Sequence, residues 1–253
     1  MLTSQRKQLI LDTLRQTGQI VAKDLSQQLG LSEDTIRRDL RELAAEGMLQ
    51  RVHGGALPAS PAIGDFATRL NVATGEKQLI GRTAAQMIQS GQVVILDGGT
   101  TAVQIARSFP PMLNATVVTH SPSVAVELVA HPNIEVQLIG GRLFKHSVVS
   151  VGAAAIEAIA RVRADIYFMG VTGIHPTAGL TTGDFEEAHI KRALSASAAE
   201  TIVLASSEKL GAASPYVVAT ITQVTGMILS ANTRPEILEP FARQGMTIFK
   251  AAT

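Results

Sequence analysis

Glycine and hydroxyl side chains cluster where an apolar run of the sequence, residues 93–97, gives way to a helical pattern. The turn reads Asp97, Gly98, Gly99, Thr100 and Thr101. Glycine lacks a Cβ, so its amide can approach an anion closely, and the N-terminus of the next helix supplies N–H groups without intrahelical partners. The turn has the composition of a phosphate-binding site, although a single turn of this kind is most often structural.

Three more turns of similar composition follow predicted strands further along the chain. They are Thr119, His120 and Ser121; Gly140, Gly141 and Arg142; and Gly170, Val171, Thr172 and Gly173. In a parallel sheet with helices on both faces, ligands bind outside the carboxyl ends of the strands. Four such turns at one edge of the sheet are much stronger evidence for a ligand-binding site than a single turn. They predict a pocket for a small phosphorylated, hydroxyl-rich molecule, with Arg142 as a cation.

Charged residues near the later strands leave two explanations open. Glu187 and Lys191 are four residues apart on a predicted helix, where an exposed ion pair would contribute only roughly 0.2–0.5 kcal/mol. Lys209 follows a predicted strand, so a solvated loop is its simplest explanation. The alternative, which the family resemblance described below implies, is that all three bind the effector. Asp97, Glu187 and Lys191 also suit proton transfer, so a sugar-phosphate isomerase or deaminase with an appended N-terminal domain is the competing function.

The segment between residues 20 and 55 shows two short helical periods separated by Gly30. Their apolar faces comprise Val21, Leu25 and Leu29, and then Ile36, Leu40 and Leu43. Ser32 is a suitable N-cap for the second helix. The polar residues of that helix form an outward row of Thr35, Arg37, Arg38 and Arg41. This arrangement predicts a helix-turn-helix whose second helix enters a DNA major groove, and the arginines disfavour a winged helix that binds only protein.

A short alternating stretch at residues 48–55 follows the predicted helix-turn-helix and ends in two glycines. Such a pattern predicts a strand and a tight hairpin, which together would form the wing of a winged helix. Arg51 and His53 would then lie near the phosphate backbone of the DNA, and Ser32 and Thr35 would also contact the backbone. Residues 1–56 carry eight Lys or Arg and seven Asp or Glu. The prediction of DNA binding therefore depends on the position of the arginines on one face and not on net charge.

Composition sets further bounds on the function. The 253 residues include 46% hydrophobic and 17% charged residues, no cysteine, and a net charge of +1. We expect a cytoplasmic protein without disulfides, metal sites or cofactors, because no histidine has a ligand partner at a recognisable spacing. Neither a signal peptide nor an apolar run of roughly 18 residues is present. A nearly neutral arm binds DNA weakly alone, so a homodimer or homotetramer is expected.

The order of apolar runs predicts an α/β protein with three parts. Residues 1–56 form the winged helix-turn-helix, starting with a helix at 4–17; residues 57–75, with two prolines and two glycines, form a linker; and residues 76–253 form the effector domain. In the last part, short β-branched runs alternate with helical periods, which indicates a mostly parallel sheet covered on both faces. Strands are predicted at 93–97, 115–119, 134–140, 165–170, 201–206, 224–230 and 246–251.

At these positions the chain resembles DeoR-type bacterial transcriptional regulators. The N-terminal match comprises Arg6, Ile10, Leu14, Ser32, Thr35, Ile36, Arg37, Arg38, Asp39 and Leu40, with the wing segment RVHGGA. The resemblance covers nearly the whole chain. It implies an effector domain with the sugar-phosphate isomerase fold, operator DNA as partner, and control of a carbohydrate operon, usually by repression, through a phosphorylated sugar.

The resemblance also bears on the effector site. Residues 97–101 match the family's Asp-Gly-Gly-Thr-Thr turn, and Glu187 and Lys191 match its Glu and Lys pair. Two other motifs depart from the family pattern. His120 stands where asparagine is usual, and Ser206 stands where aspartate is usual, in the turn that carries Lys209. These departures concern the identity of the effector more than the fold.

Overall fold

Three short helices at the N-terminus pack their apolar faces against one another. In the computed structural model, which describes residues 1–251, they are α1 (Thr3–Thr17), α2 (Ala22–Leu29) and α3 (Glu33–Ala45). Gly30 ends α2 in the left-handed conformation with φ 64°, and the Ser32 hydroxyl caps α3 by accepting a hydrogen bond from the Thr35 amide at 3.2 Å. The predicted helix-turn-helix is therefore present.

A three-stranded antiparallel sheet completes the N-terminal domain. Its strands lie in the order β1 (Ile20–Val21), β3 (Gly55–Pro58) and β2 (Leu49–Val52), and β2 and β3 form the expected hairpin. A Cβ on Gly55 would lie 1.7 Å from the carbonyl oxygen of Ile20, so only glycine fits there. The prediction that Val21 lies on the apolar face of a helix was wrong. This residue belongs to β1 and is 45% exposed, because the chain enters α2 only at Ala22.

The first and third helices are joined by a buried ion pair. Arg6 donates through Nε and through Nη2 to the carboxylate of Asp39, the latter at 3.0 Å, and the Asp39 side chain is fully buried. The bidentate hydrogen bond raises the pKa of Arg6, so its guanidinium stays charged. It fixes the angle at which α3 crosses α1.

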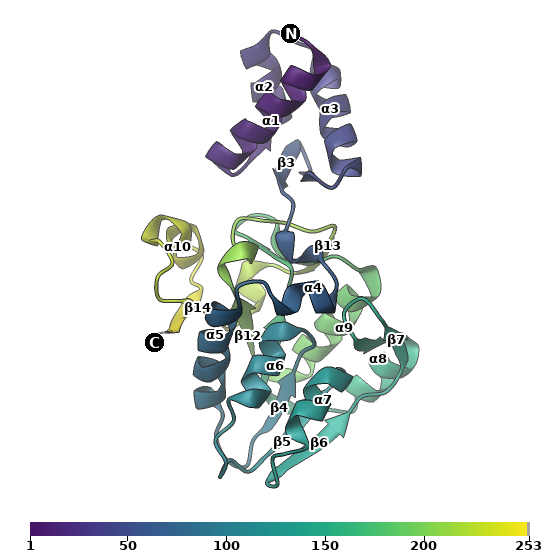
Figure 1. The fold of residues 1–253 in the computed structure, drawn as a ribbon, viewed down its shortest axis with the longest axis vertical. Coiled ribbons are helices and arrows are strands. Elements are labelled where there is room, and N and C mark those ends of the chain that lie inside the picture. Colours follow the sequence, from purple (N-terminus) through teal and green to yellow (C-terminus); the bar gives the residue numbers. More distant parts are fainter. Residues whose placement is uncertain (252–253) are drawn as a thin grey trace.

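The larger domain is built on a parallel sheet of seven strands within residues 1–251 (Figure 1). Their order is β15 (Thr247–Ala251), β14 (Gly226–Ser230), β12 (Ala198–Ala205), β9 (Ala164–Gly170), β4 (Val93–Leu96), β5 (Ala115–Thr119) and β6 (Ile134–Leu138). All neighbours pair in parallel. The predicted α/β fold class is thus confirmed, with each strand within a few residues of its expected place.

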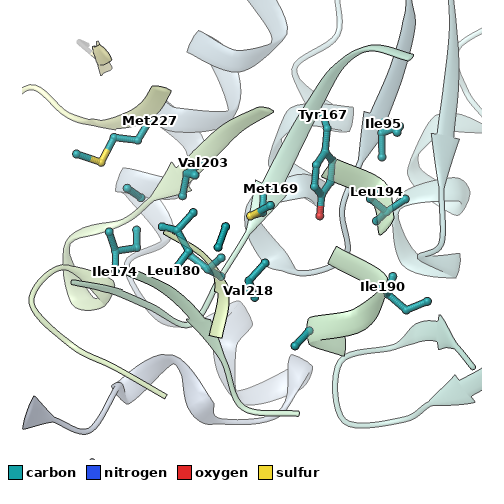
Figure 2. Close-up of a cluster of buried hydrophobic side chains, with 14 of the residues drawn as sticks. Ile95, Tyr167, Met169, Ile174, Leu180, Ile190, Leu194, Val203, Val218 and Met227 are labelled. Atoms are coloured by element: carbon teal, nitrogen blue, oxygen red, sulfur yellow. The ribbon is translucent and has the colours of Figure 1, made fainter. Parts of the chain in front are cut away.

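Helices cover both faces of this sheet. One face carries α5 (Thr74–Met87), α6 (Thr100–Arg107) and α7 (Pro122–Leu128), and the other carries α8 (Ala153–Ile159), α9 (Phe185–Ala196) and α10 (Pro235–Ala242). Alternate strand residues point to opposite faces, so Ile95 and Tyr167 join the core under α9 while Leu96 and Phe168 join the core under α6. Figure 2 shows the first of these cores, where Tyr167 and Ile95 lie beside Leu194 of α9.

Short antiparallel strands that the sequence did not indicate surround one end of the sheet. β7 (Arg142–Phe144) and β8 (Val149–Val151) form a hairpin, and β10 (Gly173–His175), β11 (Gly179–Thr182) and β13 (Tyr216–Ala219) form a separate small sheet. Strands of three or four residues have too few side chains to show a clear alternation. Two short 3-10 helices, η2 (Ser207–Lys209) and η3 (Ile221–Gln223), complete this region.

The stretch 57–75 contains more regular structure than the expected linker. After β3 it forms a 3-10 turn, η1 (Pro61–Ile63), and the short helix α4 (Phe66–Leu70), and α5 already begins at Thr74. Phe66 packs against the core under α6, whereas Leu70 is 41% exposed. Figure 1 shows this stretch as the one connection between the two domains and places α4 beside α6.

The buried pair in the N-terminal domain makes a testable prediction. Asp39→Asn leaves the Arg6 guanidinium buried without its carboxylate, so the free energy of unfolding should fall by about 3 kcal/mol. Asp12→Asn is the matched control, because Asp12 pairs with Arg15 at the surface and should cost less than about 0.5 kcal/mol. Denaturant unfolding measures both, and equal effects would contradict the assignment of the pair to the core.

Candidate effector site and DNA-binding surface

Asp97 lies at the carboxyl end of β4 and is fully buried. Its Oδ1 accepts hydrogen bonds from the Gly98 amide at 2.8 Å and from His120 Nε2 at 2.9 Å. Its Oδ2 accepts from the Gly170 amide at 2.7 Å and from Lys191 Nζ at 2.6 Å. One carboxylate therefore joins the ends of β4, β5 and β9 to helix α9.

The charge state of Asp97 follows from these neighbours. Burial alone would raise the pKa of Asp97, but the Lys191 ammonium and the His120 ring hold the pKa of this carboxyl well below its usual range. The surface ion pair that was one of the two explanations for Glu187 and Lys191 is absent from the described residues. Both side chains are buried, and Lys191 pairs with Asp97 instead.

A cavity opens directly above Asp97, at the carboxyl ends of the central strands. Its volume is about 160 Å³. Nine of the predicted effector residues line it: Gly98, Gly99, Thr100, Thr101, Gly170, Thr172, Glu187, Lys191 and Lys209. The structure therefore brings residues from β4, β9, α9 and η2 to one place.

Four predicted effector residues lie beneath the cavity and do not line it. They are Asp97, Thr119, His120 and Ser121, all fully buried. His120 Nδ1 lies 3.0 Å from the Ser150 carbonyl oxygen, and the Ser121 hydroxyl donates to the Val148 carbonyl at 3.3 Å. The β7–β8 hairpin covers the end of β5, so this turn supports the wall of the cavity from behind.

Four other predicted residues also lie outside the lining: Gly140, Gly141, Arg142 and Gly173. Arg142 is exposed and forms an ion pair with Glu186 at the surface. Gly173 belongs to β10, where a Cβ would lie 2.6 Å from Thr181 Oγ1, so this glycine serves packing. The turn at residues 140–142 follows β6, which is the last strand at one edge of the sheet. It therefore lies too far from the central strands to reach the cavity.

Two cations that the sequence analysis missed line the cavity. Arg69 comes from α4 and Lys77 from α5. The sequence could have indicated Lys77, because its spacing places it on the same helix face as Ile80 and Ala84. In the structure it lies on the inward face of α5 and is only 3% exposed. The sequence contains no such indication for Arg69, since this residue lies in a stretch whose prolines and glycines indicated a linker. Other missed polar residues of the lining are His146, Ser147, Thr182, Asp184 and Glu208.

Arg69, Lys77 and Lys209 have no carboxylate within ion-pair distance among residues 1–251. The two ammonium groups donate to backbone carbonyls instead, Lys77 to Arg69 at 2.9 Å and Lys209 to Leu204 at 3.1 Å. Burial lowers the pKa of Lys209 to about 8, and it also lowers the pKa of Arg69 and of Lys77. The cavity thus holds three cations that form no direct ion pair within the described residues, although the carboxylates of Asp184, Glu187 and Glu208 also line it.

Two hydrogen-bond acceptors face the same space. The Oε2 atom of Glu208 is buried without a partner, while its Oε1 accepts from the Ser206 hydroxyl at 2.7 Å. Glu187 lines the cavity from the first turn of α9, where the Asp184 carboxylate caps its amide at 3.0 Å. Cations and acceptors together match a ligand that carries both an anionic group and hydroxyl donors.

The predicted DNA-binding residues lie on the surface of the N-terminal domain. The side chains of Arg37 and Arg38 are 53% and 66% exposed, and each forms only an i,i+4 pair along α3. Arg37, Arg51 and His53 line one groove between α3 and the β2–β3 hairpin. Ser32 and Arg41 are exposed and Thr35 is half-buried, all on α3 or at its start.

Residues 1–251 contain neither a cluster of His, Asp and Glu side chains arranged to hold a metal ion nor a helix with both the length and the hydrophobicity of a membrane span.

Comparison with solved structures finds partial likenesses. Ribose 5-phosphate isomerase A from Methanocaldococcus jannaschii is 17% identical and has a TM-score of 0.39, with 53% of this chain and 52% of that chain covered. The eIF2B beta subunit from Chaetomium thermophilum is 14% identical with a TM-score of 0.47, over 71% and 57% of the two chains. These likenesses concern the backbone alone.

Comparison with protein families is far more specific. A DeoR-like helix-turn-helix domain matches residues 6–61, and a DeoR C-terminal sensor domain matches residues 72–231. The transcriptional regulator GlpR of Haloferax volcanii is 35% identical over 94% of this chain and 95% of its own length. The repressor GlcR of Bacillus subtilis is 32% identical over 98% and 96%, and the glycerol-3-phosphate regulon repressor of Escherichia coli is 31% identical over 82% and 83%. The chain therefore belongs to the DeoR family of DNA-binding transcriptional regulators, as its motifs predicted.

Proposed function

We propose that this regulator represses a carbohydrate-metabolism operon and that a phosphorylated sugar controls it. One observation carries the proposal: Arg69, Lys77 and Lys209 line a single small cavity and lack a carboxylate partner among the described residues. Three cations without a direct ion pair can supply charged hydrogen-bond donors to a phosphate monoester at neutral pH. The names of the similar repressors, one of which controls a glycerol-3-phosphate regulon, support the same class of effector.

The turn at the start of α6 supports the phosphate assignment. Gly98, Gly99 and Thr100 line the cavity at the N-terminus of this eight-residue helix, where unpaired amides and the helix dipole favour an anion. Glu187 and Glu208 would accept hydrogen bonds from the hydroxyls of the sugar. The phosphate and the sugar hydroxyls therefore find complementary groups in one site.

The same geometry argues against turnover. Asp97 suits a base by type, but four donors occupy its carboxylate and it is fully buried. A general base must reach a proton of the substrate, and Asp97 does not line the cavity. Glu187 does line the cavity, but the chain's similarity to transcriptional regulators favours binding over turnover. We infer that the site binds its ligand without converting it. Incubation with triose, pentose and hexose phosphates should therefore give no isomerised product by NMR.

Operator recognition would use α3 and the β2–β3 hairpin. Arg37 and Arg38 extend from α3 into solvent, and Arg51 and His53 flank the groove beside it. A domain with nearly balanced charge gains affinity when two copies bind two half-sites. We infer a cytoplasmic homodimer or homotetramer, which light scattering of the purified protein would determine.

The DNA assignment predicts the effect of removing the exposed arginines. Arg37→Ala combined with Arg38→Ala should weaken binding to the protein's own promoter DNA at least tenfold, and it should reduce the slope of log affinity against log salt by about one to two. Fluorescence anisotropy at several salt concentrations measures both. Arg161→Ala is the matched control, because Arg161 is an exposed arginine of the effector domain in an i,i+4 pair. Wild-type affinity and slope in the double variant would contradict the assignment.

The effector assignment predicts a pH dependence. An anion binds Lys209 best when the lysine is protonated, and its pKa of about 8 lies below the ordinary 10.5. Affinity for a sugar phosphate should therefore fall about tenfold between pH 7 and pH 9, as the ammonium loses its proton. Isothermal titration calorimetry with the best ligand of a sugar-phosphate panel measures this decline.

Variants at two lysines test the source of that pH dependence. Lys209→Gln should bind the ligand more weakly at pH 7 and show a smaller decline between pH 7 and pH 9. Lys250→Gln, which removes an exposed lysine of β15, should behave like the wild type. A Lys209→Gln variant with unchanged affinity would place the phosphate elsewhere.

A further inference from the structure

The segment between β3 and α5 contacts both the wing of the DNA-binding domain and the wall of the effector cavity. At its start, Pro58 pairs with Leu49 in the sheet of the wing, and its carbonyl oxygen accepts a hydrogen bond from the Ala213 amide at 3.2 Å. The next residue, Ala59, forms a parallel bridge with Ala213 of the effector domain. No residue therefore separates the last strand of the DNA-binding domain from its first contact with the effector domain.

The middle of the segment is attached to the cavity wall. The buried Ser60 hydroxyl donates to the Thr172 carbonyl and also accepts from the Ala62 amide at 3.1 Å. Thr172 lines the cavity, and so do Ala62 and Ile63. The backbone that leaves the wing is thus attached to the cavity wall within two residues of Pro58.

The end of the segment places Arg69 in the cavity lining, beside the N-terminus of α6. The Phe66 amide donates to the His146 carbonyl at 2.8 Å, and the Arg69 guanidinium donates to the Ser147 hydroxyl at 3.3 Å. A Cβ on Gly99, the N-cap of α6, would lie 3.7 Å from Arg69 Nη1. Arg69 therefore stands next to the helix terminus where the proposed phosphate binds.

We propose that Arg69 transmits occupancy of the cavity to the DNA-binding domain through the segment 58–70. This inference rests on the proposed function. A phosphate held by Arg69 and the α6 terminus draws α4 onto the cavity, and the contacts of Ser60 and Ala59 pass that constraint to β3. The ligand then favours one arrangement of the wing over another, which is the differential interaction that allosteric control requires.

Hydrogen–deuterium exchange on the full-length protein tests the first step. Inorganic phosphate is the probe, and α7 is the internal control because it lines no part of the cavity. Phosphate should slow exchange both at residues 98–103 and at residues 59–70, with α7 unchanged. Protection at 98–103 without protection at 59–70 would overturn this inference and leave the proposed function standing. Protection at neither segment would overturn both.

Matched variants test the second step. The measured quantity is the ratio of operator affinities with and without saturating phosphate, expected to be at least about fivefold in the wild type. Arg69→Gln and Lys209→Gln each remove one cation of the cavity, but only Arg69 belongs to the segment. At saturation the ratio should fall toward one in Arg69→Gln and persist in Lys209→Gln.

Ser60→Ala provides an independent check, because Ser60 does not line the cavity. Its affinity for phosphate should stay within about twofold of the wild type, while the ratio of operator affinities should fall at least about twofold. A wild-type ratio in both Arg69→Gln and Ser60→Ala would show that occupancy reaches the DNA-binding domain by another route, and the inference would be overturned.

Discussion

The architecture of the effector domain depends on keeping one ionised carboxylate away from water. Asp97 sits where three neighbouring strands end, and its two oxygens accept four hydrogen bonds from groups that belong to four elements. A buried charge is stable only when it is paired and fully hydrogen-bonded. Because Lys191 is committed to Asp97, α9 is held against the strand ends, and the floor of the cavity is set.

This arrangement separates the structural cation from the cations available to a ligand. Lys191 balances Asp97, whereas Arg69, Lys77 and Lys209 donate only to uncharged groups among the described residues. Desolvation works against their charge, as the lowered pKa of each shows. An anion that enters offsets this desolvation cost, so the cavity is electrostatically suited to one.

The sequence predicted the parts whose signal is local or periodic. Helix caps such as Ser32, the β-branched strands and the Gly-Gly-Thr-Thr turn all followed from residue type and spacing. The position of a turn within the sheet did not, because strand order is decided by packing between distant segments. This is why His120 and Arg142 were expected in the lining but lie outside it, and why Arg69 was missed. The buried Lys77 shows that an isolated charge on an apolar helix face deserves weight.

The direct passage from β3 into the contact with Ala213 has a consequence for operator architecture. A DNA-binding domain on a flexible linker tolerates half-sites at many separations, since a random coil spans a range of distances. Here the DNA-binding domain contacts the effector domain directly at the end of β3. In a symmetric assembly, the distance between two α3 helices would then depend on how the effector domains pack, and the half-site spacing of the operator would follow from that distant interface.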